Sequence, residues 1–434
     1  MSNVVHLHKP PQKIAHYLRV GFREHVLADR MRTEGRLSQF GFVFDACNVP
    51  AQKELMREVA ADGHELILDT NVAEQSAPGR YSGSVSRTPW AKADRPLGLE
   101  DCRPISNAGG ITEPIARFAV ENGFHSVLSP SHYLGGDQVR WLEIDLRNCE
   151  ALRVALDAAG GAGIRIYHEL ILSNAQLKDA GFVARVVEQL RSLPLEALWL
   201  RISGFGGDAT GAGVDKAAQA ILRFHGLGIP IVMDRVGGLP AYALTSFGVA
   251  SGYANGLKGK DRFDTSGWLK STGRGGGGNE TSVFISGLDR RVTRSELKEL
   301  FDHSTTARSI FGCRDTSCCG SVESMLREPE AHHLTEQRKT LADLSAIPEL
   351  LRGEQFLDKN LGAERKKAER SLKLKNASDD FRKLSGKAAT RLARMEKALE
   401  QTMERLGKID FAPEATLPTN VVRRTARIDG GGHR

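Results

Sequence analysis

The sequence predicts a (β/α)8 (TIM) barrel, followed by a zinc-binding segment and a basic helical C-terminal extension. Two observations predict the barrel. Eight short apolar runs occur between residues 40 and 313, and helix-like segments separate most of them. Alternating strands and helices over about 270 residues are typical of a closed parallel barrel. The competing architecture is an open doubly wound sheet, but no phosphate-binding G-x-G-x-x-G follows the first run.

The predicted strands, taken in order, are 40–46, 64–70, 125–131, 163–169, 198–204, 229–235, 248–254 and 308–313. The glycine-rich stretch 271–280 is expected to be a mobile loop between the seventh and eighth strands. The chain then divides into an N-terminal helical segment (1–37), the barrel with its zinc site (38–335), a basic helical extension (336–412) and a disordered tail (413–434).

The composition is that of a water-soluble protein. Of the 434 residues, 40% are hydrophobic and 26% are charged. No apolar run approaches the roughly 20 residues that a membrane-spanning helix needs. The N-terminus shows no apolar run followed by a cleavage site, so we expect a cytoplasmic protein whose cysteines are thiols or metal ligands.

The net charge of +7 is concentrated in the C-terminal part of the chain. From Ala331 to Arg434 there are 22 Lys and Arg against 15 Asp and Glu, a difference of +7. Such an excess fits a nucleic-acid partner, RNA or DNA, and it equally fits a solvated helix face. One long helix is expected there, with an apolar stripe at Leu384, Ala388, Leu392, Met395, Leu399 and Met403.

Polar residues end nearly every predicted strand. In a barrel the carboxyl ends of the strands meet at one mouth, where active sites lie. Asp69 and Asp234 each end an apolar run, which is expected to raise their basicity, so they are the catalytic candidates. The predicted substrate-binding residues are Asn71, Arg80, Tyr81, His168, Glu169, Arg201 and Arg235. The alternative is that strand ends are polar because they reach water.

Three cysteines and a histidine predict a zinc site. Cys313, Cys318 and Cys319 precede His333, with His332 as an alternative ligand. Three sulfurs and one nitrogen are the ligand set of a closed tetrahedral zinc centre. A redox pair of Cys318 and Cys319, or simple packing, are the other interpretations.

With these motifs the chain resembles the tRNA-guanine transglycosylases. That resemblance implies a barrel, a zinc site formed by Cys313, Cys318, Cys319 and His333, and an aspartate at the mouth that corresponds to Asp69. It further implies base exchange at a glycosidic bond, in which a carboxylate attacks the sugar and an acid protonates the leaving base. We assign the nucleophile to Asp234 and the acid/base to Asp69. A metal-dependent hydrolase with catalytic zinc and a non-catalytic scaffold for nucleic acid or another partner remain alternatives.

Overall fold

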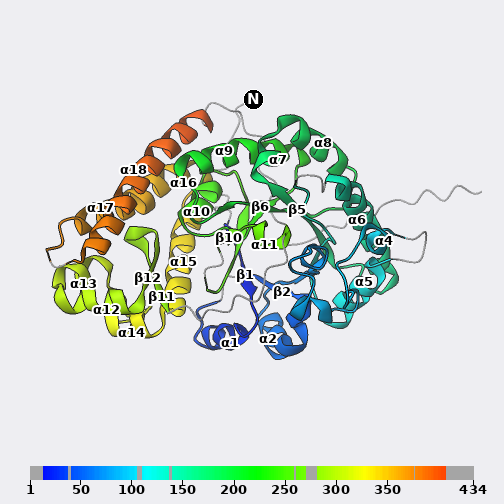
Figure 1. Ribbon diagram of the computed structural model, residues 1–434, viewed down its shortest axis with the longest axis horizontal. Coiled ribbons are helices and arrows are strands. Elements are labelled where there is room, and N and C mark those ends of the chain that lie inside the picture. The colour runs from blue at the N-terminus through cyan, green and yellow to red at the C-terminus, as the bar shows by residue number, and fades with distance from the viewer. Residues whose placement is uncertain are drawn as a thin grey trace, which may run out of the picture.

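The computed structural model is a closed barrel of eight parallel strands surrounded by helices, which confirms the predicted TIM-barrel class (Figure 1). It describes residues 13–37, 41–104, 110–135, 139–258, 261–269, 281–375 and 377–406. The barrel strands, in spatial order, are β1 (Ala15–Val20), β2 (Gly41–Asp45), β3 (Leu66–Asp69), β4 (Ser126–Leu128), β5 (Arg165–Ser173), β6 (Ala197–Ser203), β8 (Ile231–Asp234) and β9 (Gly252–Gly256).

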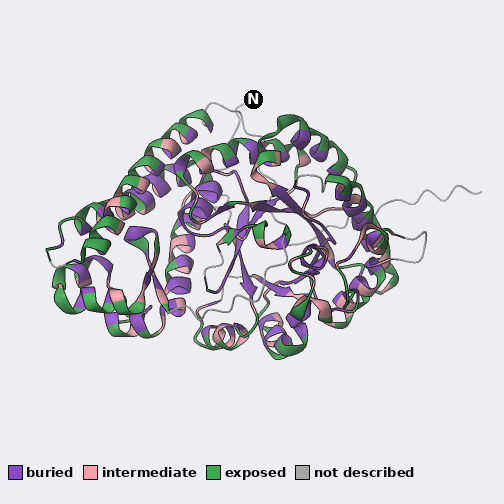
Figure 2. Cartoon of the chain, viewed as in Figure 1, coloured by how far each residue is buried: buried purple, intermediate pink, exposed green. Residues whose placement is uncertain are grey.

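Helices follow the strands and cover the outside of the barrel. They are α1 (His25–Thr33), α2 (Val49–Ala61), α5 (Thr112–Glu121), α6 (Trp141–Ala158), α8 (Ala180–Leu190), α9 (Gly211–Ile221) and α10 (Gly238–Ser246). Figure 2 shows the strands buried at the centre and the helices exposed on their outer faces. Among the described residues, no helix is both long enough and apolar enough to cross a membrane.

The predicted number of barrel strands is right, but β1 was missed and the segment predicted as the eighth strand is not a strand. β1 lies inside the segment predicted to be helical, 1–37, so the barrel begins before residue 38. The segment predicted as the eighth strand, 308–313, lies mostly in helix α13 (Thr305–Phe311), where the Ser304 hydroxyl accepts a hydrogen bond from the amide of Ala307. β1 carries two polar side chains, His16 and Arg19, and both are buried by pairing that its own sequence does not reveal.

The barrel interior is arranged in layers, because side chains along a strand alternate between its two faces. An apolar layer contains Tyr17, Val43, Ile67, Leu128, Tyr167, Trp199, Val232 and Ala254. Two residues further along six of these strands come charged side chains: Arg19, Asp45, Asp69, Glu169, Arg201 and Asp234. A charged layer therefore lies directly above the apolar one, at the carboxyl ends of the strands.

A second region follows the barrel and packs against its outside. It consists of the hairpin β11 (Ser282–Ile285) and β12 (Arg290–Thr293), then α12 (Arg294–His303), α13, α14 (Val322–Arg327), α15 (Pro329–Ser345), α16 (Glu349–Gln355), α17 (Gly362–Ser371) and α18 (Asp379–Leu406). Figure 1 shows this region on the left, with α18 running along α17 towards α9. The predictions for 271–280 and 413–434 lie outside the described residues.

The predicted apolar stripe of α18 packs against the rest of the protein. Ala388, Leu392, Met395 and Leu399 are buried, and Leu384 and Met403 are half-buried. A Cβ on Gly211 of α9 would lie 2.6 Å from the Met395 Cα, so only glycine permits this close approach. Thr402 donates a hydrogen bond of 2.8 Å to Asp215. The helical extension is therefore held on the barrel, and its burial accounts for the apolar stripe.

Candidate active site and metal centre

The charged layer at the barrel mouth is organised by two buried arginines. Arg19 of β1 makes a two-pronged pair with Asp234 of β8, Nε to Oδ1 at 2.6 Å and Nη2 to Oδ2 at 2.8 Å. Its Nη1 donates to Asp69 Oδ2 of β3 at 2.7 Å. Arg19 thus bridges the two predicted catalytic carboxylates, which the structure brings together although they lie on strands far apart in the chain.

Arg201 of β6 completes the arrangement. Its Nε donates to Asp234 Oδ2 at 2.6 Å, and its Nη2 lies 3.2 Å from Asp69 Oδ2 and 2.5 Å from Glu169 Oε1. Asp234 and Arg201 are fully buried, and Glu169 is 3% exposed. Buried charges are tolerated only when they are paired, and Asp69 and Asp234 meet that condition. Arg201 Nη1 and Glu169 Oε1 have no hydrogen-bond partner among the described residues, although Glu169 forms an ion pair with Arg201.

The carboxyl groups of the cluster differ in the direction in which their pKa is shifted. Burial would raise the pKa of Asp234, but Arg19 and Arg201 outweigh it and hold that pKa well below its usual range. The same balance lowers the pKa of Asp69. Burial outweighs Arg201 at Glu169, whose pKa is raised well above its usual value, and burial beside Asp69 raises the pKa of Glu74. Opposite shifts in neighbouring carboxyls provide an anion and an acid at one site.

This result corrects the sequence-based argument for Asp69 and Asp234. Apolar surroundings were expected to raise their basicity, whereas two guanidinium groups lower it. Asp69 is therefore poorly suited to the acid role assigned to it, and Glu169 suits that role better. Arg19, the centre of the cluster, was missed; a single arginine near the end of the alternating run Ala15–Val20 was the available signal.

Of the other five residues predicted to bind substrate, two, His168 and Arg235, directly precede or follow a member of the charged layer in the chain. The His168 ring accepts or donates a hydrogen bond at Nδ1 with Ser129 Oγ, 3.0 Å away, and burial lowers its pKa to about 4, so the ring is neutral. Arg235, at φ 55°, keeps a side chain that is 20% exposed, and its Nη2 lies 3.7 Å from Glu74 Oε1.

The remaining three lie in the segment after β3 and differ in their surroundings. Asn71 is buried at φ 56°, and its side-chain oxygen accepts a hydrogen bond from the Cys47 amide at 3.3 Å, so it shapes the turn. Arg80 is exposed and Tyr81 is half-buried. Among the described residues, no hydrogen bond or ion pair connects these last two side chains with the charged layer.

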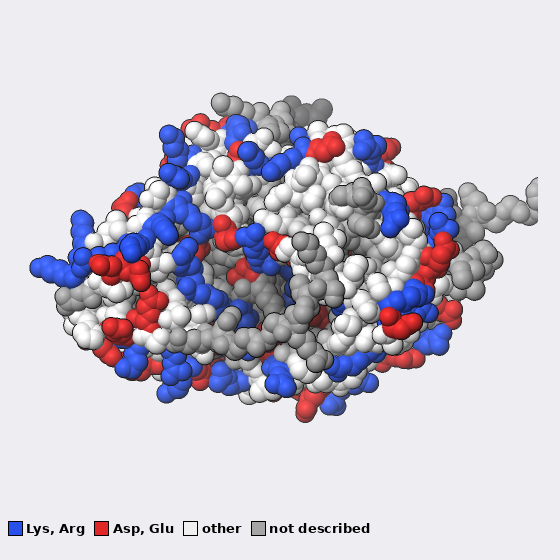
Figure 3. Space-filling view, viewed as in Figure 1, with Lys and Arg blue, Asp and Glu red and all other residues white. Residues whose placement is uncertain are grey.

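Aromatic side chains cover part of the layer. The guanidinium carbon of Arg201 lies 5.4 Å from the Phe263 ring centroid, and Phe263 packs on Trp268 of α11 (Ser266–Leu269). Phe263 belongs to β10 (Arg262–Phe263), which pairs with β7 (Phe205–Gly206). Asp45, with a side chain 26% exposed, and Arg235 reach solvent. Figure 3 shows a hollow near the centre of this face, with Lys and Arg side chains along part of its border.

The predicted metal ligands also come together. The candidate ligand atoms of Cys313, Cys318, Cys319 and His332 all lie within 4.8 Å of one another. The two adjacent sulfurs are 3.5 Å apart, and His332 Nδ1 lies 3.3 Å from Cys318 Sγ and 3.4 Å from Cys319 Sγ. Tetrahedral zinc with Zn–S bonds of about 2.3 Å separates its sulfurs by about 3.8 Å, so the donor set fits a metal ion.

A tight turn presents the two adjacent cysteines. The amides of Cys318, Cys319 and Gly320 all donate to the carbonyl of Asp315, at 3.0, 3.0 and 2.8 Å, and Gly320 takes φ 72°. The histidine beside the three cysteines is His332, the alternative ligand, and not His333. Both histidines lie on α15, and successive side chains on a helix point about 100° apart, so only one can face the cysteines. His333 packs instead against Phe284, with ring centroids 4.7 Å apart.

Comparison with known proteins adds little to this geometry. No protein-family model matches the chain, and no curated protein matches its sequence. Among solved structures, the chain is similar to a GH10 xylanase from Bispora sp. MEY-1 with xylobiose, at 11% identity and a TM-score of 0.35, over 56% of this chain and 83% of that one. That similarity is too low to carry an argument about activity.

Proposed function

We propose that the protein is an enzyme that acts at the glycosidic bond of a nucleoside, in the manner of the tRNA-guanine transglycosylases that its motifs resemble. One observation carries this proposal: two carboxylates kept ionised by shared arginines lie beside a carboxyl whose pKa is raised. Glycosidic-bond chemistry needs a carboxylate at the sugar carbon and an acid at the leaving group.

In the proposed reaction, Asp234 is the nucleophile and Glu169 is the acid. An Asp234 oxygen attacks the anomeric carbon, the bond between that carbon and the base breaks, and Glu169 gives its proton to the departing base. An incoming base then attacks the same carbon and releases Asp234, while Glu169 takes up the proton that this base loses. Arg19 and Arg201 keep Asp234 ionised, and Asp69 holds the two arginines in place.

Access to Asp234 requires a change in the covering aromatic residues. Asp234 is fully buried, and the Phe263 ring lies over Arg201, its partner. A substrate would reach the carboxylate only after Phe263 and Trp268 move, so their movement is part of the proposal. Closed aromatic covers that exclude water also strengthen the electrostatic interactions beneath them.

The metal in this proposal is zinc with a structural role. Three cysteines and one histidine saturate tetrahedral zinc, whereas catalytic zinc keeps a position open for water. This argument disfavours the metal-dependent hydrolase. Zinc at this position would tie the turn 313–320 to α15 and so stabilise the region outside the barrel.

Base exchange is tested by incubating the protein with RNA or DNA and radiolabelled guanine and measuring the label retained in the polymer. Glu169→Gln and Asp234→Asn should each lower incorporation by about 10²- to 10⁴-fold. The exposed residues Glu121 and Asp343 provide the matched controls Glu121→Gln and Asp343→Asn. Incorporation that survives both mouth substitutions, in protein that keeps its thermal midpoint, would overturn the assignment.

A nucleic-acid substrate has a candidate contact surface on α18. Lys383, Lys387, Arg394 and Lys397 are exposed on one face of that helix, opposite its buried stripe. We propose that this basic face contacts phosphates. Because α18 packs on the barrel, the test is substitution of these side chains and not removal of the helix.

A further inference from the structure

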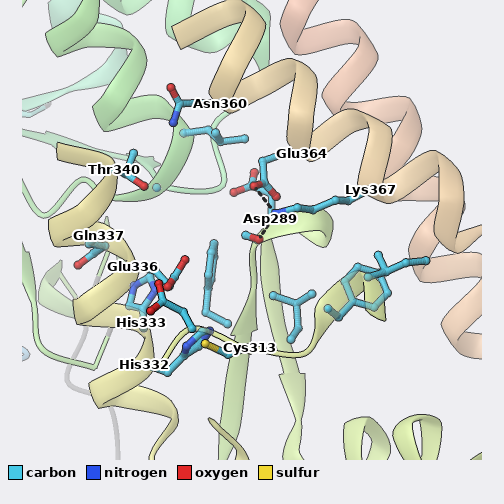
Figure 4. Close-up of a pocket in the computed structure, with 18 of the residues that line it drawn as sticks. Asp289, Cys313, His332, His333, Glu336, Gln337, Thr340, Asn360, Glu364 and Lys367 are labelled. Atoms are coloured by element: carbon cyan, nitrogen blue, oxygen red, sulfur yellow. Dashed lines mark hydrogen bonds and ion pairs between the residues drawn. The ribbon is translucent and has the colours of Figure 1, made fainter. Parts of the chain in front are cut away.

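A separate pocket lies outside the barrel, next to the metal ligands. Its volume is about 310 Å³, and α10, the β11–β12 hairpin, α15 and α17 contribute its walls. Figure 4 shows His333, Glu336 and Gln337 of α15 on one side and Asp289, Glu364 and Lys367 on the other. Cavities of this size are at the small end of the range for ligand sites and accommodate one ring with a short substituent.

Two residues that line this pocket carry buried polar atoms without partners. His333 is 4% exposed and Gln337 is 2% exposed. Among the described residues, His333 Nε2 and both amide atoms of Gln337 have no hydrogen-bond partner. An unsatisfied buried polar atom is costly, so three of them in residues that line one cavity call for a ligand or ordered water.

Helix α15 links the pocket to the metal site. Residues 333, 336, 337 and 340 line the pocket and recur at three- and four-residue steps, so they share one face of α15. His332 lies on the adjacent face, turned towards the cysteines. A metal ion bound there would fix the same turn of the helix that carries His333 and Gln337.

The pocket is acidic, with apolar walls. Asp289, Asp315, Glu336 and Glu364 line it, with Arg314 and Lys367. Arg391 pairs with Asp289, and Lys339 pairs with Asp315 and lies 3.9 Å from Glu336, so Glu364 is the acid with a free oxygen. Lys367 Nζ binds one oxygen of Glu364, at 3.1 Å, while the other oxygen has no partner among the described residues. The apolar walls come from Leu239, Tyr242, Phe284, Ile310 and Phe311. Aromatic walls and the unpaired carboxylate oxygen of Glu364 suit a ring that carries a positive charge.

We propose that this pocket binds a small organic cation, a ring bearing an amine or amidine, with the charged group at the unpaired oxygen of Glu364 and hydrogen bonds to Gln337. Burial raises the pKa of Glu364. A bound cation would favour its ionised form and so be held more tightly than a neutral molecule of the same shape. The site is independent of the reaction proposed at the barrel mouth.

Benzamidine and the neutral benzamide are matched probes, titrated into the full-length metal-bound protein by calorimetry. Benzamidine should bind at least about tenfold more tightly than benzamide, because only the cation gains the charged hydrogen bonds. Glu364→Gln and Gln337→Leu should each weaken benzamidine binding by about tenfold. Glu400→Gln and Gln401→Leu, at exposed positions of α18, are the matched controls.

Three results would overturn the proposal: equal binding of the two probes, no binding of either at millimolar concentration, or benzamidine binding unchanged by both pocket substitutions. If Gln337→Leu lowers the thermal midpoint, the proposal is judged by benzamidine binding to Glu364→Gln alone, because that substitution removes one charge with almost no change of shape. Removing the metal with a chelator should also weaken benzamidine binding, through α15.

Discussion

The barrel mouth and the outer pocket both bury charged side chains, but these side chains differ in how they are paired. At the mouth, Arg19 and Arg201 satisfy both oxygens of Asp234 and hold Asp69 as well. The two aspartates at the mouth are fully paired, although Glu74 Oε2, Glu169 Oε1 and Arg201 Nη1 there also lack hydrogen-bond partners among the described residues. In the outer pocket, the unpaired atoms belong to His333, Gln337 and Glu364.

From this difference we infer that the ion pairs at the mouth stabilise the fold, whereas the unpaired atoms of the pocket are available to a ligand. A buried ion pair is sensitive to the loss of either member, since the partner left behind becomes buried and unpaired. Replacing an unpaired group costs little, because no protein partner is abandoned. Substitutions at the two places should therefore differ in size and in the property they change.

The largest effect is expected for Arg201→Met, which removes one of the two arginines that Asp69 and Asp234 share, together with the arginine that pairs with Glu169. The free energy of unfolding should fall by about 3–5 kcal/mol, measured by urea denaturation. Arg117→Met, at an exposed helix position, is the control and should change it by less than about 0.5 kcal/mol. A near-normal stability for Arg201→Met would mean that the mouth network contributes little to folding.

The second-largest effect is expected at the metal site, where replacing His332 and replacing the adjacent His333 should give different zinc contents. Zinc content by metal analysis should be close to one equivalent in the native protein and in His333→Ala, and near zero in His332→Ala. The loss of zinc should also lower the thermal midpoint, because binding energy at a structural site is folding energy. Zinc retained in His332→Ala but lost in His333→Ala would show that the ligand assignment is inverted.

A smaller effect, dependent on pH, is expected for Glu169→Gln. Because the pKa of Glu169 is raised in the folded protein, the folded state holds this proton more tightly than the unfolded chain. That stabilisation is complete below the ordinary glutamate pKa of about 4.3 and is lost as pH rises towards the folded pKa, by at most about 1.4 kcal/mol per pH unit. Glutamine stays neutral throughout.

Glu169→Gln should therefore match the native protein at pH 4 and equal or exceed its stability at pH 8, as measured by denaturant titration at both values. Glu121→Gln should show no such trend. A variant that is less stable at pH 8 than at pH 4, relative to the native protein, would indicate that Glu169 is an anion paired with Arg201.

The smallest effect concerns exposed charge. Lys387→Gln and Arg394→Gln should leave stability within about 0.5 kcal/mol, because neither side chain is buried. If α18 contacts phosphates, each substitution should lower the log–log salt slope of RNA or DNA binding by roughly 0.7–0.9. Lys53→Gln on α2 is the control. An unchanged slope would remove α18 from the nucleic-acid surface.

Much of the fold followed from local patterns. Seven of the eight barrel strands overlap predicted runs, since consecutive buried β-branched and aromatic residues identify a strand without reference to its neighbours. The β1 strand was missed because Arg19 and His16 are polar, and only their partners, Asp234 and Asn255, explain why they are buried. Those partners lie 215 and 239 residues away in the chain.

By itself, the sequence determined the type of barrel, the polar strand ends and the grouping of three cysteines with a histidine pair, because each depends on residues close together in the chain. Only the tertiary structure decided that Arg19 joins Asp69 to Asp234, that the pKa of these aspartates is lowered, and that His332 faces the cysteines. A pKa and a ligand set depend on distances between atoms, and closure of the barrel and packing of α15 set those distances.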